Sequence, residues 1–412
     1  MSYARGIRID PRLGIWLGLL VVVTMGTVLP EYAAGVPAFA RRHKLSCTTC
    51  HTPFPRLKDY GEEFAGNGFI LPEGEEDRDY VNVGDDLLRL NRDFHIGARF
   101  DAYMVYDQDR PVETDLQIPW GIKLLSGGAV TRTVGYYFYF YMSERGEVAG
   151  IEDAYLHFND LGGSPLDIMV GQFQTSDPLM KRELRLTFED YQIYKTRVGS
   201  SHNNLAYDRG VMVTYGIEAT HTDLVALVVN GNGKEEAGDD HKFDSDKYKN
   251  YGARISQGLG ELFRVGYYYY AGEEAGSPVI PDGDPLPDPM PIRKNDITYH
   301  GPDFSAGNGM FDLTCQYLIR TDTNPQFVDG PTEIETTGLV AELVISPHRD
   351  QSRHYYTLLY NQIDSDLDGH DYETFTGGVT YLMARNLRLN LEFTRDVAGE
   401  RNRGVIGVVS GF

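Results

Sequence analysis

Residues 93–412 divide into short segments in which apolar and polar residues alternate, and this pattern constrains the fold more than any other feature of the chain. Alternation with a period of two is typical of strands whose two faces meet different surroundings. Between residues 311 and 320 the apolar side chains fall on one face and the polar ones on the other, and residues 387–394 repeat the pattern. About sixteen such segments can be counted, beginning near residues 94, 114, 131, 149, 164, 204, 221, 250, 262, 293, 309, 334, 353, 370, 386 and 403.

The connections between these segments alternate in length. Residues 219–222 and 384–386 are short turns, whereas residues 175–203 and 231–249 are long and polar. A soluble sandwich would show the same strand alternation, but an even number of strands with short turns at one end and long loops at the other indicates a bacterial outer-membrane barrel. We therefore expect an all-β chain that forms a transmembrane β-barrel of about 16 antiparallel strands, with its apolar face toward lipid and its polar face toward the lumen.

Cys47-Thr48-Thr49-Cys50-His51 forms a C-x-x-C-H motif, the pattern of covalent c-type haem attachment. Two thiols at this spacing can each add to a haem vinyl group, and the adjacent histidine can bind the iron. A zinc site would need a second pair of ligands, and Cys315 is the only other cysteine. The motif predicts one haem c, whereas Cys315 falls on an apolar strand face and is expected to be an inert, lipid-facing residue.

Residues 1–34 are predicted to be a secretory signal peptide. Arg5, Arg8 and Arg12 give a positive n-region, and residues 13–28 are apolar and uncharged. The alternative is a transmembrane anchor, but the apolar run is short for a membrane span. Export fits the haem motif because c-type attachment takes place outside the cytoplasm in bacteria.

Residues 35–92 are predicted to form a small helical haem segment ahead of the barrel. Within it, residues 55–64 indicate a short helix with apolar side chains at i, i+3 and i+7. A segment of this size with few apolar residues is marginally stable alone, whereas a barrel of about sixteen strands has a lumen that can hold a plug. We therefore expect the segment to plug or cap the barrel, with the haem in the lumen or at its periplasmic mouth.

Residues 38–41, 46–55 and 64–69 are similar to the fused outer-membrane cytochrome–porins of iron-oxidising bacteria. In that family a monohaem cytochrome segment precedes a porin of about sixteen strands, and some members oxidise Fe(II). The resemblance is specific around residues 38–69 and otherwise covers the mature chain in plan. It implies thioether links at Cys47 and Cys50 and proximal iron ligation by His51, and it implies electron transfer more firmly than it implies iron as the donor.

The sequence does not determine the second axial ligand of the iron. A methionine would raise the reduction potential relative to a histidine. The candidates are His43, His95, His202, Met104, Met142, Met180 and Met212.

Two loops have competing interpretations. Residues 175–203 carry mixed charges and form the third outward loop, which in porins of this size often folds inward and sets selectivity. An external loop is equally compatible with the sequence. Asp364–Asp371 matches the first half of a calcium loop, but the twelfth position is Phe375 rather than glutamate, so a polar hairpin loop is favoured.

The net charge of −22 argues against nucleic acid as a partner. The expected function is electron transfer across the outer membrane through a single haem c, from extracellular Fe(II) or another redox donor to a periplasmic cytochrome or copper protein. The haem would carry the chemistry of such an Fe(II)-oxidising cytochrome. Two alternatives remain open, namely a haem-bearing porin for small solutes and outward transfer to an extracellular acceptor. The expected location is the bacterial outer membrane, in contact with its lipid.

Overall fold

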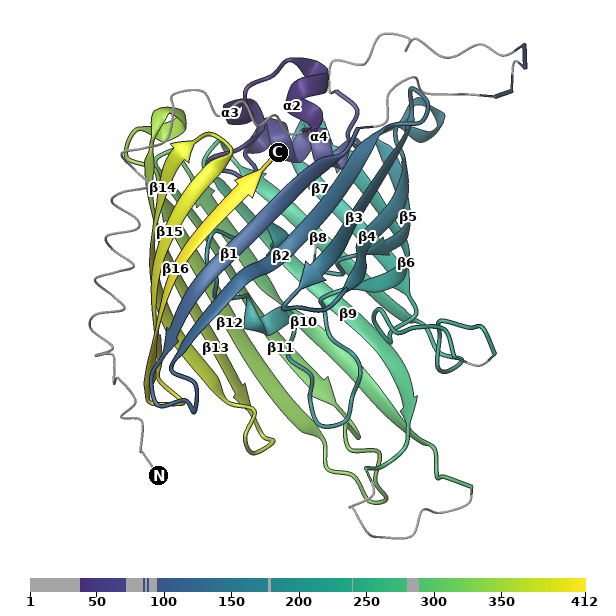
Figure 1. Cartoon of the computed structure of the whole chain (residues 1–412). Helices are drawn as coiled ribbons and strands as arrows, with labels where there is room; N and C mark the ends of the chain where they lie inside the picture. The colour runs from purple at the N-terminus through teal and green to yellow at the C-terminus, as the bar shows by residue number, and fades with distance from the viewer. Residues whose placement is uncertain are drawn as a thin grey trace, which may run out of the picture.

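The computed structural model describes residues 38–71, 84–85, 87–88, 95–176, 179–238, 240–279 and 289–412. These residues form a closed barrel of sixteen antiparallel strands, with three short α-helices at one mouth (Figure 1). The predicted all-β barrel is therefore confirmed. The predicted signal peptide, residues 1–34, lies outside the described residues.

Each strand pairs with its neighbours in sequence, and β1 pairs with β16 to close the barrel. Sixteen strands in the described residues begin within four residues of the predicted positions. The strands are β1 (Gly97–Asp107), β2 (Thr114–Ala129), β3 (Val134–Glu144), β4 (Gly150–Phe158), β5 (Leu166–Phe173), β6 (Asp208–Ile217), β7 (Thr222–Val229), β8 (Asn250–Leu259), β9 (Phe263–Gly276), β10 (Arg293–Gly307), β11 (Phe311–Asp322), β12 (Ile334–Ile345), β13 (His354–Ser365), β14 (Tyr372–Ala384), β15 (Leu387–Asp396) and β16 (Arg401–Gly411).

The α-helices are α2 (Ala38–His43), α3 (Cys47–Cys50) and α4 (Asp59–Gly66). Short 3₁₀ turns are η1 (Leu161–Gly163), η2 (Arg182–Leu184), η3 (Gln192–Tyr194), η4 (Glu218–Thr220) and η5 (Arg349–Gln351). No helix in the described part of the chain is both long and apolar enough to cross a membrane.

The two faces of the strands follow the predicted alternation. On β15, Arg388 is 2% exposed toward the lumen, whereas Phe393 is 56% exposed on the outside of the barrel. The tyrosines at residues 267–270 divide between the faces in the same way. Tyr268 is fully buried in the lumen, and Tyr267 points outward beside it. Only alternate tyrosines of this run can therefore face lipid, because neighbouring side chains on a strand point to opposite faces.

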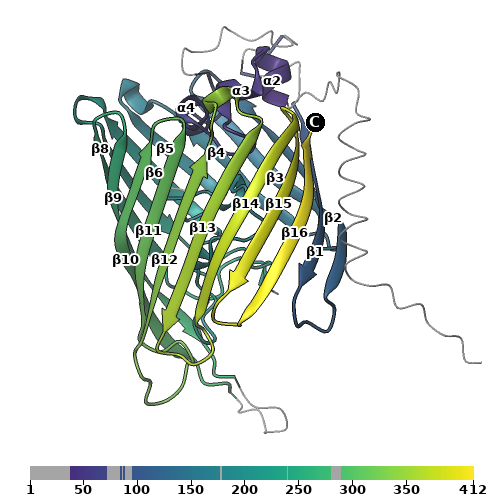
Figure 2. The same cartoon turned by 90° about the vertical axis from the view of Figure 1, so that its left-hand side faces the viewer.

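The two ends of the barrel differ as the loop lengths predict. The short turns, the C-terminus and helices α2–α4 share one end, and the longer loops lie at the other (Figures 1 and 2). In outer-membrane barrels the end with short turns faces the periplasm. The predicted helix at residues 55–64 instead begins at Asp59, because residues 51–57 turn back on themselves and form an isolated bridge between His51 and Leu57.

The described residues of the long connection between β5 and β6, 174–176 and 179–207, fold into the lumen, and this resolves the choice that the sequence left open. Tyr194 and Leu205 of this lumen loop are fully buried, and Ile193 is 6% exposed. All three belong to one apolar cluster with side chains of the barrel wall. A Cβ atom on wall residue Gly338 would lie 2.7 Å from Ile193, so glycine provides the space that the loop occupies.

Candidate functional site

The two cysteines of the motif lie on α3, at the barrel end that carries the short turns. The Ser46 hydroxyl caps this single turn by accepting a hydrogen bond from the Thr48 backbone N–H at 3.3 Å. Cys47 and Cys50 are both free thiols and are half-buried. Burial raises the pKa of each thiol. Both side chains line the same cavity, so two thiols three positions apart in sequence face one space.

His51 is held by the turn that follows it. Its Nδ1 lies 3.1 Å from the carbonyl oxygen of Pro55 and 3.2 Å from that of Arg56. Carbonyl oxygens only accept hydrogen bonds, so Nδ1 carries the proton and Nε2 keeps its lone pair. Burial lowers the pKa of His51 to about 4, which favours the neutral imidazole. A neutral imidazole whose other nitrogen donates to a carbonyl is the usual state of an iron-ligating histidine.

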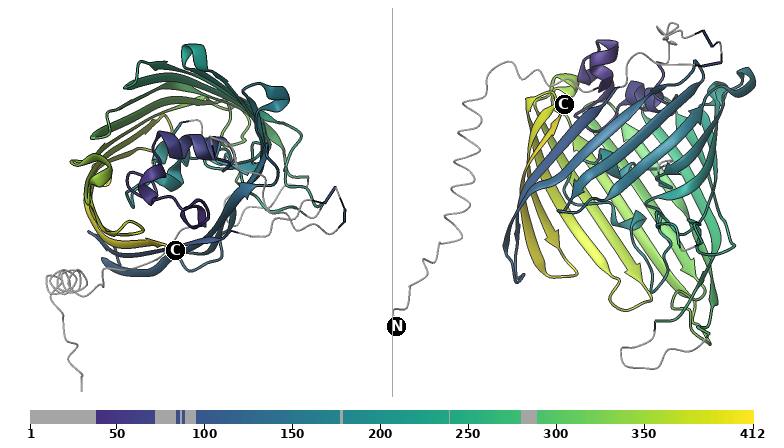
Figure 3. Two further views of the ribbon diagram at one scale, coloured as in Figure 1. Left: turned by 90° about the horizontal axis from the view of Figure 1, so that it is seen from above. Right: turned by 45° about the vertical axis from the view of Figure 1, so that its right-hand side comes forward.

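The cavity has a volume of about 190 Å³ and is bounded by three parts of the molecule. These are the N-terminal segment, the inner wall formed by β1–β4, and the start of the lumen loop. Figure 3, in the view from above, shows the helices of the segment lying over the barrel mouth. Most of the cavity lining is apolar or aromatic, as a haem macrocycle requires. The lining includes His43, Cys47, Cys50, His51, Phe54, Leu57, Tyr60 and Phe64 from the segment, Arg99, Leu125, Tyr137, Tyr139, Asp153 and Tyr155 from the wall, and Gln174, Lys181, Glu183 and Leu184 from the loop.

A set of packed aromatic rings forms one wall of the cavity. Phe39 and Phe69 stack with ring centroids 5.1 Å apart, and Phe64 packs edge-on against both. Phe69 also stacks on Tyr137 of β3 at 4.5 Å. Pairs of this kind contribute about 0.5–1.5 kcal/mol each beyond the area that they bury. The rings therefore join the N-terminal segment to the barrel at the cavity.

The segment is fixed to the barrel on both sides of the mouth. On one side, Arg56 forms an ion pair with Glu342 of β12, whose side chain is fully buried. On the other, the carbonyl of Asn67 accepts a hydrogen bond from the side chain of Asn159. Gly135 of β3 permits the closest approach, since a Cβ atom there would lie 2.0 Å from the Gly68 oxygen. The segment thus spans the mouth as a cap.

Replacing Arg56 with alanine should release this cap from the barrel. The substitution leaves the buried Glu342 carboxylate without its cation and is expected to cost about 3 kcal/mol of docking free energy. Proteolysis within residues 44–58 should become roughly a hundredfold faster, because cleavage follows the population of the open state.

Lys58→Ala is the matched control for this experiment. Lys58 pairs with Asp350 at 2.8 Å, but this pair is exposed and should contribute only about 0.5 kcal/mol. Equal acceleration of proteolysis by the two substitutions would contradict the assignment of Arg56 as the main electrostatic attachment.

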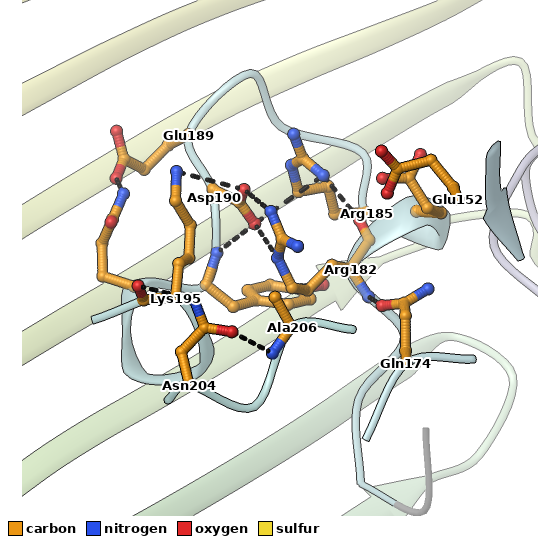
Figure 4. A network of polar contacts seen from close by, with 12 residues as sticks. Glu152, Gln174, Arg182, Arg185, Glu189, Asp190, Lys195, Asn204 and Ala206 are labelled. Atoms are coloured by element: carbon orange, nitrogen blue, oxygen red, sulfur yellow. Dashed lines mark hydrogen bonds and ion pairs between the residues drawn. The ribbon is translucent and has the colours of Figure 1, made fainter. Parts of the chain in front are cut away.

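A buried charge network orders the lumen loop beside the cavity (Figure 4). Asp190 accepts hydrogen bonds from Arg182 at 2.6 and 3.2 Å, and Arg185 and Lys195 lie 3.7 and 3.5 Å away. Burial alone would raise the pKa of Asp190, but the surrounding cations hold it well below its usual range. The carboxylate therefore stays charged and gathers three cationic side chains of the loop around one point.

The loop is bonded to the wall on the far side of the lumen. The backbone N–H groups of Phe188 and Glu189 donate to Glu392 of β15 at 2.6 and 3.0 Å. The Tyr191 hydroxyl donates to Glu342 of β12 at 2.9 Å. Arg320 of β11 donates to the carbonyl oxygen of Asn203 at 3.1 Å. Since the loop starts at β5 and ends at β6, these contacts show that it crosses the lumen.

A second polar group, around Glu183, adjoins the cavity. Tyr139 and Tyr141 each donate to the Glu183 carboxylate at 3.1 Å, and Lys123 approaches the same oxygen at 3.2 Å. Burial would raise the pKa of Glu183, but Lys123 and nearby arginines, Arg185 first, lower it well below its usual range. The sequence analysis did not identify this group, because the alternation along a strand does not show which inward-facing tyrosines will contact the lumen loop.

Of the seven candidates for the second axial ligand, the cavity lining includes only His43. The other six lie elsewhere. His95 contacts Arg42, His202 contacts Glu235 near the opposite mouth, and Met142 is 46% exposed on the outside. Met180 and Met212 are buried in the core cluster of the lumen, and Met104 follows the buried Tyr103 on β1.

The acidic sequence 364–371 forms the end of the β13–β14 hairpin, as the sequence favoured. Asp371 accepts a hydrogen bond from the Ser365 backbone at 3.1 Å. Within the described residues, no group of three or more His, Cys, Asp or Glu side chains could hold a metal ion. Cys315 pairs in register with Phe304 and Ala341 in the wall, on the outward face where the alternation placed it.

Solved outer-membrane porins share the fold of this chain. A loop-deletion mutant of OmpT from Vibrio cholerae matches with a TM-score of 0.53 and 13% identity, over 78% of this chain and 99% of that chain. The anion-selective porin from Comamonas acidovorans matches with a TM-score of 0.54 and 11% identity, over 78% and 99%. Salmonella typhi OmpF in complex with daunomycin gives 0.52 and 10%, over 77% and 97%. No protein-family model and no curated protein matched the chain.

Proposed function

We propose that this protein is an electron-transfer protein of the bacterial outer membrane that carries one haem c at the periplasmic mouth of a porin-like barrel. Cys47 and Cys50 would hold the haem through thioether links, and His51 would bind its iron. The observation that carries this proposal is that both thiols and the imidazole line a single, largely apolar cavity. The bound haem would supply a centre that gains and loses one electron.

The protein's own residues would position this centre and limit access to it. The Pro55 and Arg56 carbonyls orient His51, and the aromatic wall around Phe64 excludes water from one side. The lumen loop separates the cavity from the mouth that bears the long loops. Extracellular Fe(II) is the proposed donor of the electron, and a periplasmic cytochrome or copper protein is the proposed acceptor. Under this arrangement the ferric product would stay outside the cell.

The second candidate function is that of a porin for small solutes, and the similarity of the fold to solved porins supports it. The chain shares its architecture with porins, one of which is described as anion-selective. The lumen loop argues against a wide channel. Its apolar side chains occupy part of the lumen, and its hydrogen bonds to β12 and β15 hold it there. Outward electron transfer would use the same site as inward transfer and differs only in the partners.

Fe(II) should rapidly reduce the oxidised full-length protein in detergent, and His51→Ala should abolish this reduction. Loss of the imidazole removes the iron ligand, whereas the hydrogen bonds of the His51 ring go to the Pro55 and Arg56 carbonyls of the segment and not to a barrel strand. Stopped-flow absorbance at the c-type α-band measures the reaction, and heat-modifiable gel mobility reports barrel assembly. His221→Ala, an exposed turn residue, is the matched control. A wild-type protein that conducts solutes freely and is not reduced by Fe(II) would favour the porin instead.

A further inference from the structure

We propose that His43 is the second axial ligand of the haem iron, on the face opposite His51. This inference rests on the proposed function, since it presumes the covalent haem. Its first support is placement. His43 lines the same cavity as Cys47, Cys50 and His51, and the other six histidine and methionine candidates lie outside that lining.

The path of the backbone brings the two histidines to one cavity. Helix α2 ends at His43, where Lys44 adopts a left-handed conformation with φ of 54° and the Leu45 N–H bonds to the Ala40 carbonyl at 3.2 Å. This six-to-one hydrogen bond around a left-handed residue terminates a helix and redirects the chain. His43 and Cys47 are therefore not successive turns of one helix. His43 and His51 therefore come from separate elements that both line the cavity.

The orientation of the His43 ring is also constrained. It packs edge-on against Phe64, with centroids 5.7 Å apart and planes 81° apart. Phe64 is itself fixed between Phe39 and Phe69 and is only 5% exposed. His51 has a similar support, because it packs edge-on against Phe54 at 5.4 Å. Each imidazole is thus braced by a phenylalanine ring, which limits the rotation that would move it away from the iron.

Lys181 is the main rival for this position. Its side chain lines the cavity from the lumen loop, and an amine can also bind iron. Lys181 reaches the cavity from the lumen loop, whereas His43 belongs to the same segment as Cys47, Cys50 and His51 and is held by Phe64. This placement favours His43 over Lys181.

Electron paramagnetic resonance and optical spectra of the oxidised, detergent-purified full chain test the assignment. The wild-type protein should be low-spin with two nitrogen ligands. His43→Ala should lose the low-spin signal, become high-spin and regain it with added imidazole. His43→Met should stay low-spin with a raised reduction potential, because methionine favours ferrous iron. His202→Ala, at the far mouth, and Lys181→Ala should leave the spectrum unchanged.

A high-spin wild-type protein, an unchanged low-spin His43→Ala protein, or loss of the low-spin signal in Lys181→Ala would each overturn the assignment. A pyridine haemochrome assay on every variant separates this inference from the proposed function. Wild-type protein without covalent haem would overturn both. Wild-type protein with one haem but an unaltered His43→Ala spectrum would overturn the His43 assignment alone.

Discussion

Replacing both Cys47 and Cys50 with alanine is expected to abolish covalent haem attachment while leaving the barrel assembled. The thioether bonds are the only links that survive denaturation, so haem staining on a denaturing gel should fall from one haem per chain to none. The barrel should persist, because the segment contacts it at the mouth and contributes no strand to the closed sheet. Heat-modifiable gel mobility measures assembly in the same samples.

The chain contains its own matched control for this experiment. Cys315→Ala removes a cysteine from the outward face of β11, far from the motif in sequence, and should leave haem staining unchanged. Single substitutions at Cys47 or Cys50 should leave at most one thioether and a shifted α-band. Full haem staining of the double variant would contradict the attachment site, and loss of staining in Cys315→Ala would indicate a general folding defect.

Most of the barrel could be predicted from the sequence, because strand alternation and turn length depend on residues that are close together in the chain. A strand between lipid and a polar lumen must alternate, and a turn between two neighbouring strands must be short. β11 shows this directly, with Gln316 at 1% exposure and Tyr317 at 38%. These constraints act within a few residues, so sixteen strands could be counted without knowledge of their partners.

The lumen loop could not be predicted, because its position depends on distant residues. Tyr191 reaches Glu342, and Asn361 donates to the Asp190 carbonyl at 3.0 Å, yet more than 150 positions separate these partners. The charges at Arg182 and Asp190 fit an exposed loop equally well. The loop folds inward because Ile193 and Tyr194 are buried in the apolar cluster of the lumen. A single sequence does not reveal that Ile193 packs against Gly338.

The candidate site divides in the same way. The spacing of Cys47, Cys50 and His51 predicts covalent haem attachment, which stays a prediction, and the structure shows that these three residues line one cavity. The cavity wall could not be predicted, because Tyr137 and Tyr139 read as ordinary strand tyrosines until β3 is seen beneath the segment. The predicted helix start at residue 55 was wrong for a related reason. The backbone from Thr52 to Arg56 turns, and two of its carbonyl oxygens contact the His51 ring. Helix propensity does not predict such a turn.

Fold and motif point to different functions, and the lumen loop is the element that separates them. In porins the third loop narrows the lumen through which solutes pass, and in this chain the lumen loop crosses to the opposite wall. Here buried carboxylates of β12 and β15 bind the loop, and Arg320 adds hydrogen bonds from β11. Removing the polar partners on one side would leave buried charges on the other side unpaired, so the loop is held firmly across the lumen.

Excising residues 186–204 and closing the gap with a short glycine–serine linker should turn a poorly conducting barrel into an open pore. The excision keeps Lys181 and Glu183 at the cavity but removes the apolar core and the bonds to the opposite wall. We expect single-channel conductance in planar bilayers to rise roughly tenfold, because the lumen of a sixteen-stranded barrel holds water unless it is plugged. Haem content should stay unchanged in the same preparations.

Two arginine substitutions should affect the conductance to different extents. Arg320→Ala removes hydrogen bonds to the carbonyls of Thr196 and Asn203 and should give brief openings. Arg254→Ala breaks a wall-to-wall pair with Asp303 at 2.7 Å and should leave conductance at the wild-type level. A wild-type protein that already conducts like an open porin would contradict the closed lumen and favour solute transport. An excised variant that still fails to conduct would mean that the N-terminal cap, rather than the lumen loop, closes the barrel.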